Sequence, residues 1–300
     1  MKLLNCPDIH LAEKRPENRV DDYEATVLRK FRFILGVAEE NDCDGILFPG
    51  DLFDGPTPSY AFYSQIISYM KDSGKLMIVV PGQHDQRYRN LENTALWAAG
   101  ISVDNLTVMS QKHDSEPLTQ PDNVLIQGCG WEEEIPEPIP SKFNILLIHR
   151  MIVDDKLWAE QEHFEYGNGF LRDRKFDLIV SGDNHKTFTA HSRGRYLFNC
   201  GSMMRSTIAQ VDHKPMIIVF DTENPKEYRE ILIPIEPAES VFKMDKVETE
   251  KERNTNLEAF VSGLSEHKDM GLNFGDNLQA YVIENKLGNE IYELLKRGMA

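Results

Sequence analysis

The sequence lacks any hydrophobic run long enough to cross a membrane. Among its 300 residues, no apolar stretch approaches the roughly 20 residues that a membrane-spanning helix needs. Only Leu3 and Leu4 follow Lys2 at the start, which is far short of the apolar core of a signal peptide. The sequence therefore predicts no membrane partner and a cytoplasmic location.

Cysteines are few and widely separated. The four cysteines are Cys6, Cys43, Cys129 and Cys200, and they form no CxxC pair. Most of them lie in or beside apolar runs, as buried thiols do in a reducing compartment. We therefore expect neither disulfides nor a zinc–thiolate site.

Positive charge is also scarce. The chain has 33 lysines and arginines against 49 aspartates and glutamates, which gives a formal net charge of −16. An evenly spread charge of this sign repels nucleic acid, because non-specific binding depends on neutralising phosphates with basic side chains. Any nucleic-acid function must therefore rely on bound metal, a local basic face or a partner protein.

The chain does contain an alternation of short apolar runs and longer segments of helical spacing. Strands are predicted at 2–6, 45–48 and 76–80, with helices at 22–40 and 60–71 between them. Further strands are predicted at 124–128, 144–148, 178–180, 196–199, 216–220 and 228–233, where the helical signal fades. The order favours a largely parallel sheet, and so many strands fit two stacked sheets flanked by helices.

A junction is predicted at residues 234–237, where strand spacing stops and helical spacing takes over. Beyond it, Leu257, Phe260, Val261 and Leu264 stand at i, i+3, i+4 and i+7, a spacing typical of one face of an amphipathic helix. The predicted organisation is a main domain at 1–235 and a small helical C-terminal region at 236–300.

Metal-binding types of side chain follow five of the predicted strands. They are Asp8 with His10, Asp51 with Asp54, Gln83 with His84 and Asp85, then His149, and finally Asp183 with His185. Each of these taken alone is as easily a turn, because Asp is a common turn former. Strand ends are where α/β proteins bind ligands, so five such ends indicate a single site at one edge of the sheet.

The chemistry of these residues indicates metal. Carboxylates and imidazoles without cysteine suit divalent manganese, iron or zinc. Asp8, Asp51 and Asp183 would repel one another strongly if they clustered without a cation. Two cations about 3.5 to 4 Å apart would neutralise them and activate water as a nucleophile.

The ordered motifs DIH, GDLFD, GQHD, a lone His149 and GDNH resemble the calcineurin-like metallophosphoesterase superfamily, whose pattern is DxH, GDxxD, GNHD/E, H and GHxH. The likeness covers roughly residues 1–235. Within it, the segments GDLFDGPTPSYA, VPGQHD and RYLFNCGSMMRST are most similar to the SbcD-type nuclease subunit and its phage relatives. The resemblance implies an α/β fold, a four-layer αββα sandwich with a small C-terminal helical region.

Seven residues are metal ligands by this resemblance, in two groups that share one carboxylate. The first-metal group is Asp8, His10 and His185, the second-metal group is Gln83, His149 and Asp183, and Asp51 bridges the two. Gln83 stands where the family usually has Asn, and Asp183 stands where it has His. Both changes fall on the second metal, and the added carboxylate favours harder ions. The implied cofactors are two divalent ions, Mn2+ first and Mg2+ as the alternative.

The resemblance also implies catalytic roles. His84 is the expected general acid for the leaving oxygen, and Asp85 is expected to orient its imidazole. Asp54 either hydrogen-bonds within its own loop or contacts phosphate directly. Arg87 and Arg205 are candidate substrate contacts, with a solvated surface position as the alternative for each.

The function implied by the resemblance is manganese-dependent exonuclease and endonuclease cleavage of DNA in a repair or recombination complex. The implied partners are DNA and an SbcC-type ATPase subunit. The C-terminal helices either bind this ATPase subunit or form a cap on the main domain. A homodimer and a phage origin both stay open. The rival interpretations are a metallophosphoesterase acting on a small phosphoester or a phosphoprotein, and a non-catalytic scaffold whose second metal site is spoiled.

Overall fold

The structure of the chain is a computed structural model that describes residues 1–113, 115–120, 123–157 and 161–249. Contacts group Met1–Phe242 into one compact unit and Lys243–Ala300 into a second. The predicted C-terminal helices lie outside the described residues, so they and the predicted boundary after residue 235 stay predictions. Among the described residues, none of the helices combines the length and apolar character that a bilayer crossing demands.

The first sheet carries the start of the chain. Its strand order is β14-β13-β1-β2-β3-β4. The bounds are β1 Lys2–Asn5, β2 Gly45–Phe48, β3 Leu76–Val79, β4 Leu106–Val108, β13 Met216–Asp221 and β14 Arg229–Leu232. β1 to β4 run parallel, whereas β13 and β14 are antiparallel to their neighbours. The predicted largely parallel sheet is confirmed.

The second sheet has the strand order β11-β12-β10-β7-β6-β5. The bounds are β5 Leu118–Thr119, β6 Val124–Cys129, β7 Phe143–His149, β10 Leu178–Gly182, β11 Phe188–Ser192 and β12 Arg195–Asn199, with β8 Ile152–Val153 and β9 Glu165–Tyr166 forming a separate short pair. β6, β7, β10 and β12 run parallel. Their carboxyl ends therefore meet at one edge.

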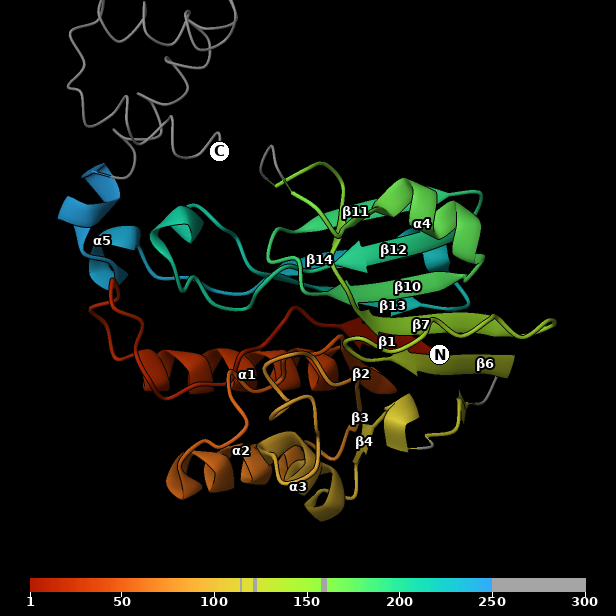
Figure 1. Cartoon of the computed structure of the whole chain (residues 1–300), viewed down its shortest axis with the longest axis horizontal. Helices are drawn as coiled ribbons and strands as arrows, with labels where there is room; N and C mark the ends of the chain where they lie inside the picture. Colours follow the sequence, from red (N-terminus) through yellow and green to blue (C-terminus); the bar gives the residue numbers. More distant parts are fainter. Residues whose placement is uncertain (114, 121–122, 158–160, 250–300) are drawn as a thin grey trace, which may run out of the picture. The chain divides into compact units, whose positions relative to one another are not determined.

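Helices cover the outer faces of both sheets. These covering helices are α1 Tyr23–Glu40, α2 Tyr60–Ser73, α3 Ala95–Ser102 and α4 Gly167–Arg174. The described residues also form the short helix α5 Ala238–Val241 and 3-10 turns at Gln111–His113, Ile208–Gln210 and Pro225–Glu227. Side chains fix the starts of α1 and α2: the Ala25 N–H donates to Asp22 and the Phe62 N–H donates to Ser59. In Figure 1, α1, α2 and α3 lie together beyond the first sheet, and α4 lies beyond the second.

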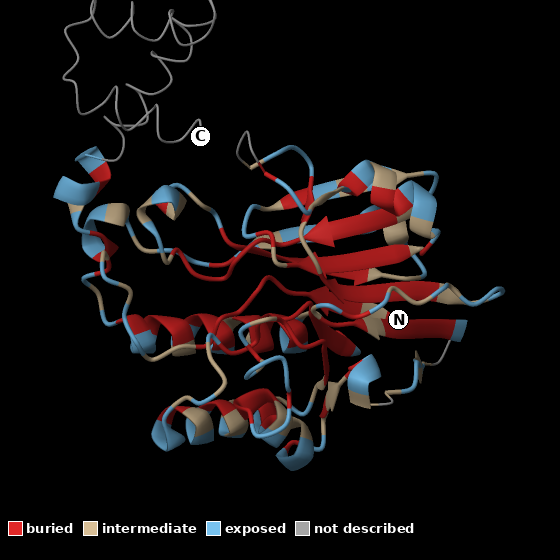
Figure 2. Ribbon diagram, in the orientation of Figure 1, coloured by how far each residue is buried: buried red, intermediate tan, exposed pale blue. Residues whose placement is uncertain are grey.

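Alternate residues of the strands supply separate cores. Leu4 faces α1 in the outer core of the first sheet, whereas Leu3 faces the second sheet. The core between the sheets also contains Ile78 and Leu147, and α4 packs Phe170 into the outer core of the second sheet. Figure 2 shows these strands as almost wholly buried. The described residues thus form the predicted αββα layers.

Several elements of the structure are absent from the sequence prediction, namely helices α3 and α4 and the strands β4, β5, β8, β9 and β11. Helix α4 lies in the part of the chain beyond Leu106, where the sequence shows no clear helical signal. The signal is weak because the glycines and charged residues of α4 leave only a short apolar face around Phe170 and Leu171. Strand β11 is not among the predicted strands either, since only Phe188 among its residues is buried. The prediction of free cysteines is confirmed, because all four are buried and unbridged.

Candidate metal centre

Parallel strands deliver the predicted ligands to one edge of the two sheets. Asp8 follows β1, Asp51 follows β2, Gln83 follows β3, His149 ends β7, and Asp183 follows β10. The two sheets face each other, so ligands from different sheets meet across the interface between them. Asp183 illustrates this, because its backbone N–H donates to the Asp8 carboxylate at 2.8 Å.

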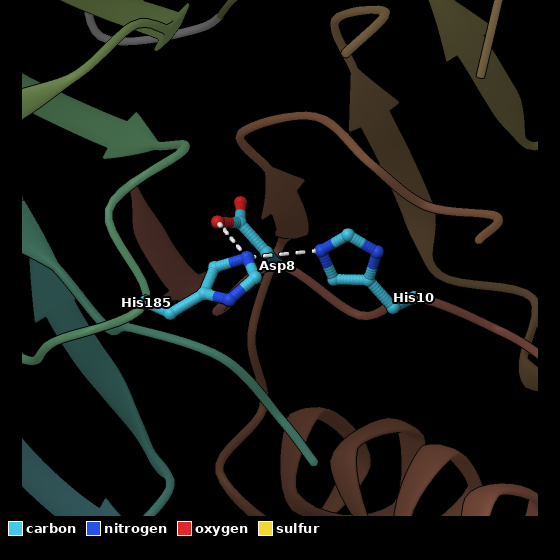
Figure 3. A group of neighbouring side chains, drawn as sticks. All are labelled: Asp8, His10 and His185. Atoms are coloured by element: carbon cyan, nitrogen blue, oxygen red, sulfur yellow. Dashed lines mark hydrogen bonds and ion pairs between the residues drawn. The ribbon is translucent and has the colours of Figure 1, made fainter. Parts of the chain in front are cut away.

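The first-metal group converges on a small volume. One ligand atom each from Asp8, His10 and His185 lies within 4.8 Å of the others. Figure 3 shows the two imidazoles and the carboxylate turned toward one another. The Nε2 atoms of His10 and His185 lie 3.1 Å apart, and Asp8 Oδ2 lies 3.8 Å from His185 Nε2. This is a donor set that a divalent cation can bridge.

The second-metal group is held together through Gln83. Its Oε1 lies 2.7 Å from His149 Nε2, and its Nε2 donates to Asp183 Oδ1 at 3.1 Å. His149 Nδ1 lies 2.8 Å from the Pro49 carbonyl, which can only accept, so Nδ1 carries a proton. His149 Nε2 then faces acceptor oxygens alone. A positive group must lie there, either a second proton or a metal ion.

Asp51 stands between the two groups. Its Oδ2 lies 3.4 Å from His149 Nε2 and 3.6 Å from His10 Nε2, and its Oδ1 accepts a hydrogen bond from the His84 N–H at 2.8 Å. Asp51 Oδ2 and Asp8 Oδ1 are buried and have no hydrogen-bond partner among the described residues. Buried carboxylate oxygens are costly unless they are paired or coordinate a metal. The residues present therefore fit divalent cations.

The backbone is strained where these ligands lie. His10, Asp51 and Asp183 have left-handed φ values of 48°, 45° and 79°, a conformation that costs about 1–2 kcal/mol per residue. Gly82 and Gly182 allow the close approach, because a Cβ on either would collide with the carboxylate of Asp51 or Asp8. Such strain persists where surrounding structure enforces a functional geometry.

His84 lies at the open side of this centre. Its side chain is 43% exposed, and its ring contacts the His10 ring edge-on with centroids 4.9 Å apart. The His84 Nδ1 lies 3.3 Å from the Asp54 carbonyl oxygen and 3.7 Å from the Asp54 carboxylate. The same carboxylate lies 2.9 Å from His10 Nδ1. Asp54 therefore contacts both imidazoles and can orient them, a role that differs from the hydrogen bonding within its own loop that the sequence predicted.

Residues 1–187 match the family model described as calcineurin-like phosphoesterase. The chain belongs to the calcineurin-like phosphoesterase family. Members of this family are metal-dependent hydrolases that bind two divalent metal ions, and the ligand groups described above occupy the corresponding motifs. The prediction of a metallophosphoesterase is thus confirmed at the level of the family.

The solved structures that the chain resembles are distant from it in sequence. The crystal structure of TT1561 from Thermus thermophilus is 11% identical, with a TM-score of 0.52 over 78% of this chain and 99% of that chain. Wild-type Vps29 complexed with zinc from Entamoeba histolytica is 13% identical, with a TM-score of 0.34 over 78% of this chain and all of that one. No curated protein matches the sequence. The likeness to TT1561 concerns the fold alone.

Charges in the calcineurin-like centre are strongly coupled. Burial disfavours the His149 imidazolium, but the Asp51 and Asp8 carboxylates outweigh burial and raise the pKa of His149 to about 10. Burial raises the pKa of Asp8 to about 8 against the opposing effect of His149. Burial lowers the pKa of His185 to about 4. Metal ligands must be deprotonated, so a bound cation replaces these protons.

Asp85 does not orient His84, contrary to the sequence prediction. Its buried carboxylate accepts hydrogen bonds from the backbone N–H groups of Leu52, Phe53 and Gly82, at 3.2, 2.9 and 3.0 Å. It thereby ties the loop after β2 to the loop after β3. Burial, followed by the charge of Asp51, raises the pKa of Asp85 to about 7.

Arg205 is not a phosphate contact either. Its side chain is only 3% exposed, and its guanidinium donates to the carbonyls of Val211 and Glu236 at 2.9 and 2.5 Å. Arg205 thus anchors the chain before α5. Arg87 is exposed, so the structure is compatible with its predicted role.

Asn184 has no predicted role from the sequence, yet the structure places it at the centre of the last motif. Asn184 is fully buried, donates to the Ile152 carbonyl at 2.9 Å and accepts from the Lys186 N–H at 2.9 Å. It fixes the loop so that Asp183 and His185 both reach the metal centre. Its position between two predicted ligands, Asp183 and His185, is the sequence signal that could have identified it.

Proposed function

We propose that the chain is a two-metal-dependent DNA phosphodiesterase, an SbcD-like exonuclease and endonuclease subunit of a repair or recombination complex. Metal-dependent hydrolysis is supported chiefly by the Asp51 carboxylate, which has an oxygen without a hydrogen-bond partner between the two ligand groups. Asp51 also lies beside His84, whose side chain is about half exposed. The DNA part is supported by the SbcD-like segments that surround the metal motifs. DNA and an SbcC-type ATPase subunit are the proposed partners, and a homodimer is an alternative assembly.

The ligand residues prepare a site for phosphate. The first-metal and second-metal groups, with Asp51 between them, would hold two divalent cations, which we propose to be Mn2+ with Mg2+ as an alternative. When bound, such cations polarise phosphoryl oxygens and lower the pKa of water. Burial of Asp8 and Asp51 excludes bulk water from the carboxylates, which strengthens their attraction for cations and keeps phosphate at the exposed side.

His84 supplies the proton that the leaving oxygen needs. Asp54 holds Nδ1 of this imidazole, so the proton on Nε2 is the one that can pass to a leaving oxygen. His84 is close to the metal centre, because its own backbone N–H donates to Asp51. A phosphodiester held there therefore meets an acid that is already oriented.

Substrate class is tested by comparing polymers with a small diester. The full-length chain with Mn2+ is assayed on linear DNA and on bis(4-nitrophenyl) phosphate, with and without an SbcC-type ATPase subunit. Cleavage of DNA that is lost in His84→Ala and retained in His191→Ala supports the proposal, since His191 is an exposed histidine on β11. Turnover of the small ester without DNA cleavage, even with the ATPase subunit, favours a small-phosphoester or phosphoprotein enzyme instead.

A further inference from the structure

A tight turn follows His84 directly in the chain. Arg87 and Asn90 exchange backbone hydrogen bonds, with N···O distances of 2.8 and 3.0 Å in the two directions. The two residues between them, Tyr88 and Arg89, have left-handed φ values of 52° and 61°. Positive φ at both central positions is the geometry of a type I′ turn.

Tyr88 is an unfavourable residue for this position. Type I′ turns favour Asn, Asp and Gly, and a bulky side chain at positive φ is a conformational outlier. Packing does not compensate for the strain, because Tyr88 is 92% exposed. The chain therefore maintains a strained backbone that presents an aromatic ring to solvent, and such local strain is concentrated at ligand-binding positions.

The arginines on either side of Tyr88 in the sequence each lie against an aromatic ring. The Arg87 guanidinium lies 5.7 Å from the centroid of the Tyr88 ring, and the Arg89 guanidinium lies 5.8 Å from that of Trp131. Arg89 also lies 3.5 Å from Glu132, in an exposed ion pair of little strength. We call Arg87, Tyr88, Arg89 and Trp131 the arginine–aromatic patch. It is a local basic face on a chain whose formal net charge is −16.

The patch is attached to the metal centre by short connections. The Trp131 N–H donates to the Pro81 carbonyl at 2.8 Å, and the Gln86 N–H donates to the Gln83 carbonyl at 3.4 Å. Tyr88 is four residues from His84, so their Cα atoms are at most about 14 Å apart. This distance corresponds to a few nucleotides at about 3.4 Å per nucleotide along one strand.

We propose that Tyr88 stacks on an unpaired base of a DNA strand whose phosphodiester lies at the metal centre, while Arg87 and Arg89 contact flanking phosphates. This inference rests on the proposed function and adds a substrate class, single-stranded DNA or frayed ends. Exposed aromatic rings bind single strands because each base offers a π-face, and arginines attract the backbone. A paired base inside a duplex has both faces covered, so the duplex interior gains nothing from Tyr88.

The experiment uses three oligonucleotides in Mn2+, each with phosphorothioate linkages that resist hydrolysis: a single strand, the same strand made abasic near the bound end, and its full duplex. Binding to the full-length chain is measured by fluorescence anisotropy for Tyr88→Asn and Tyr88→Phe. Asn suits the left-handed turn, so its loss of binding does not come from misfolding. Tyr60→Ala is the matched control, because Tyr60 is equally exposed at 92% but begins α2.

The proposal predicts that Tyr88→Asn weakens single-strand binding by at least about fivefold, the loss of one base–aromatic stack. Tyr88→Phe keeps the ring and binds like the wild type, as does Tyr60→Ala. On the abasic strand and the duplex, Tyr88→Asn binds like the wild type.

Equal single-strand binding by Tyr88→Asn and the wild type overturns the inference, and so does a wild type that binds no single strand. If Tyr88→Asn instead loses only the ATPase subunit, the patch is a protein interface and the inference is wrong. The proposed function fails separately, if the wild-type chain hydrolyses no DNA in Mn2+. The cleavage assay measures that result independently of the binding assay.

Discussion

The two metal groups differ in how their ligands are supported. The first-metal group, Asp8, His10 and His185, has the residues that the family pattern expects, and one of its imidazoles, that of His185, is 44% exposed. In the second-metal group both departures from the pattern occur, yet Gln83 contacts both of the other ligands. Its amide is long enough to reach His149 and Asp183 at once.

The two departures from the family pattern are linked by a hydrogen bond between their side chains. The carboxylate of Asp183 accepts a hydrogen bond from the Gln83 amide, and the extra methylene of Gln83 lets its oxygen stay 2.7 Å from His149. A shorter Asn at position 83 would lose reach, and a His at position 183 would lose the carboxylate acceptor. We therefore propose that the second-metal group is an alternative construction of the same site rather than a degraded one.

The largest effect is expected from Asp51, which both groups share. Asp51→Asn removes the charge between them and should reduce DNA cleavage on the order of a thousandfold or more, because metal stabilisation of a phosphoryl transition state contributes several kcal/mol. Elemental analysis should show fewer than two bound Mn2+ ions. Normal cleavage with both ions present would remove Asp51 from its bridging role.

Replacement of His84 should separate proton transfer from metal binding. His84→Ala should lower kcat about 10²- to 10⁴-fold, the usual contribution of a general acid, while both metal groups still bind their ions. Steady-state kinetics and elemental analysis on the same preparation measure the two effects. His191→Ala serves as the control and should match the wild type. Loss of metal together with activity would make His84 a ligand instead.

The linkage between the departures is tested with a double-mutant cycle. Gln83→Asn and Asp183→His should each weaken binding of the second Mn2+ ion on the order of tenfold, because each breaks a contact within the group. The double variant, which restores the usual family residues, should recover much of that affinity. Isothermal titration calorimetry measures all four proteins. Strict additivity of the two losses would show that the departures are independent.

The smallest effect is a pH dependence of the metal-free chain. Between pH 6.5 and 8.0, the folded state retains most of the protons on His149 and Asp8, whose pKa values are raised to about 10 and about 8. In the unfolded chain the aspartate has already released its proton, and the histidine releases its own across this interval. Stability should therefore fall as pH rises, by roughly 2 kcal/mol per retained proton across this interval. Stabilisation by Mn2+ should grow over the same interval, because binding displaces those protons.

Denaturant unfolding at the two pH values, with and without Mn2+, measures this pair of trends. His149→Gln is the informative variant, because it removes one of the two protons and should flatten the metal-free trend. A metal-free chain whose stability rises from pH 6.5 to 8.0 would contradict the electrostatic description of the second-metal group.

The sequence predicted the parts of the structure that depend on local pattern. The apolar runs located most of the strands, and the polar residues after five of them converge as expected on one edge. The candidate metal ligands were identifiable because strand ends combine a fixed position with a recognisable residue type. The αββα layers followed from the number and order of strands.

The errors concern residues whose roles depend on distant partners. Arg205 follows a recognised motif, but its hydrogen-bond acceptors are Val211 and Glu236, and no local pattern indicates that it is buried. Asp85 stands beside His84 in sequence, yet its carboxylate turns to backbone groups of the preceding loop. Helix α4 buries too few residues for its periodicity to be visible. The roles of Arg205 and Asp85 and the presence of α4 depend on burial and on hydrogen bonds between distant parts of the chain, which local sequence patterns do not indicate.

The number of Mn2+ ions bound per chain at saturation, with their positions located by anomalous scattering, measures directly whether both metal groups bind a cation. A functional second-metal group predicts two ions, one within reach of His10 and His185 and the other within reach of Gln83, His149 and Asp183. A single ion in the first-metal group, with His84→Ala indistinguishable from the wild type, would contradict the account and identify a non-catalytic scaffold.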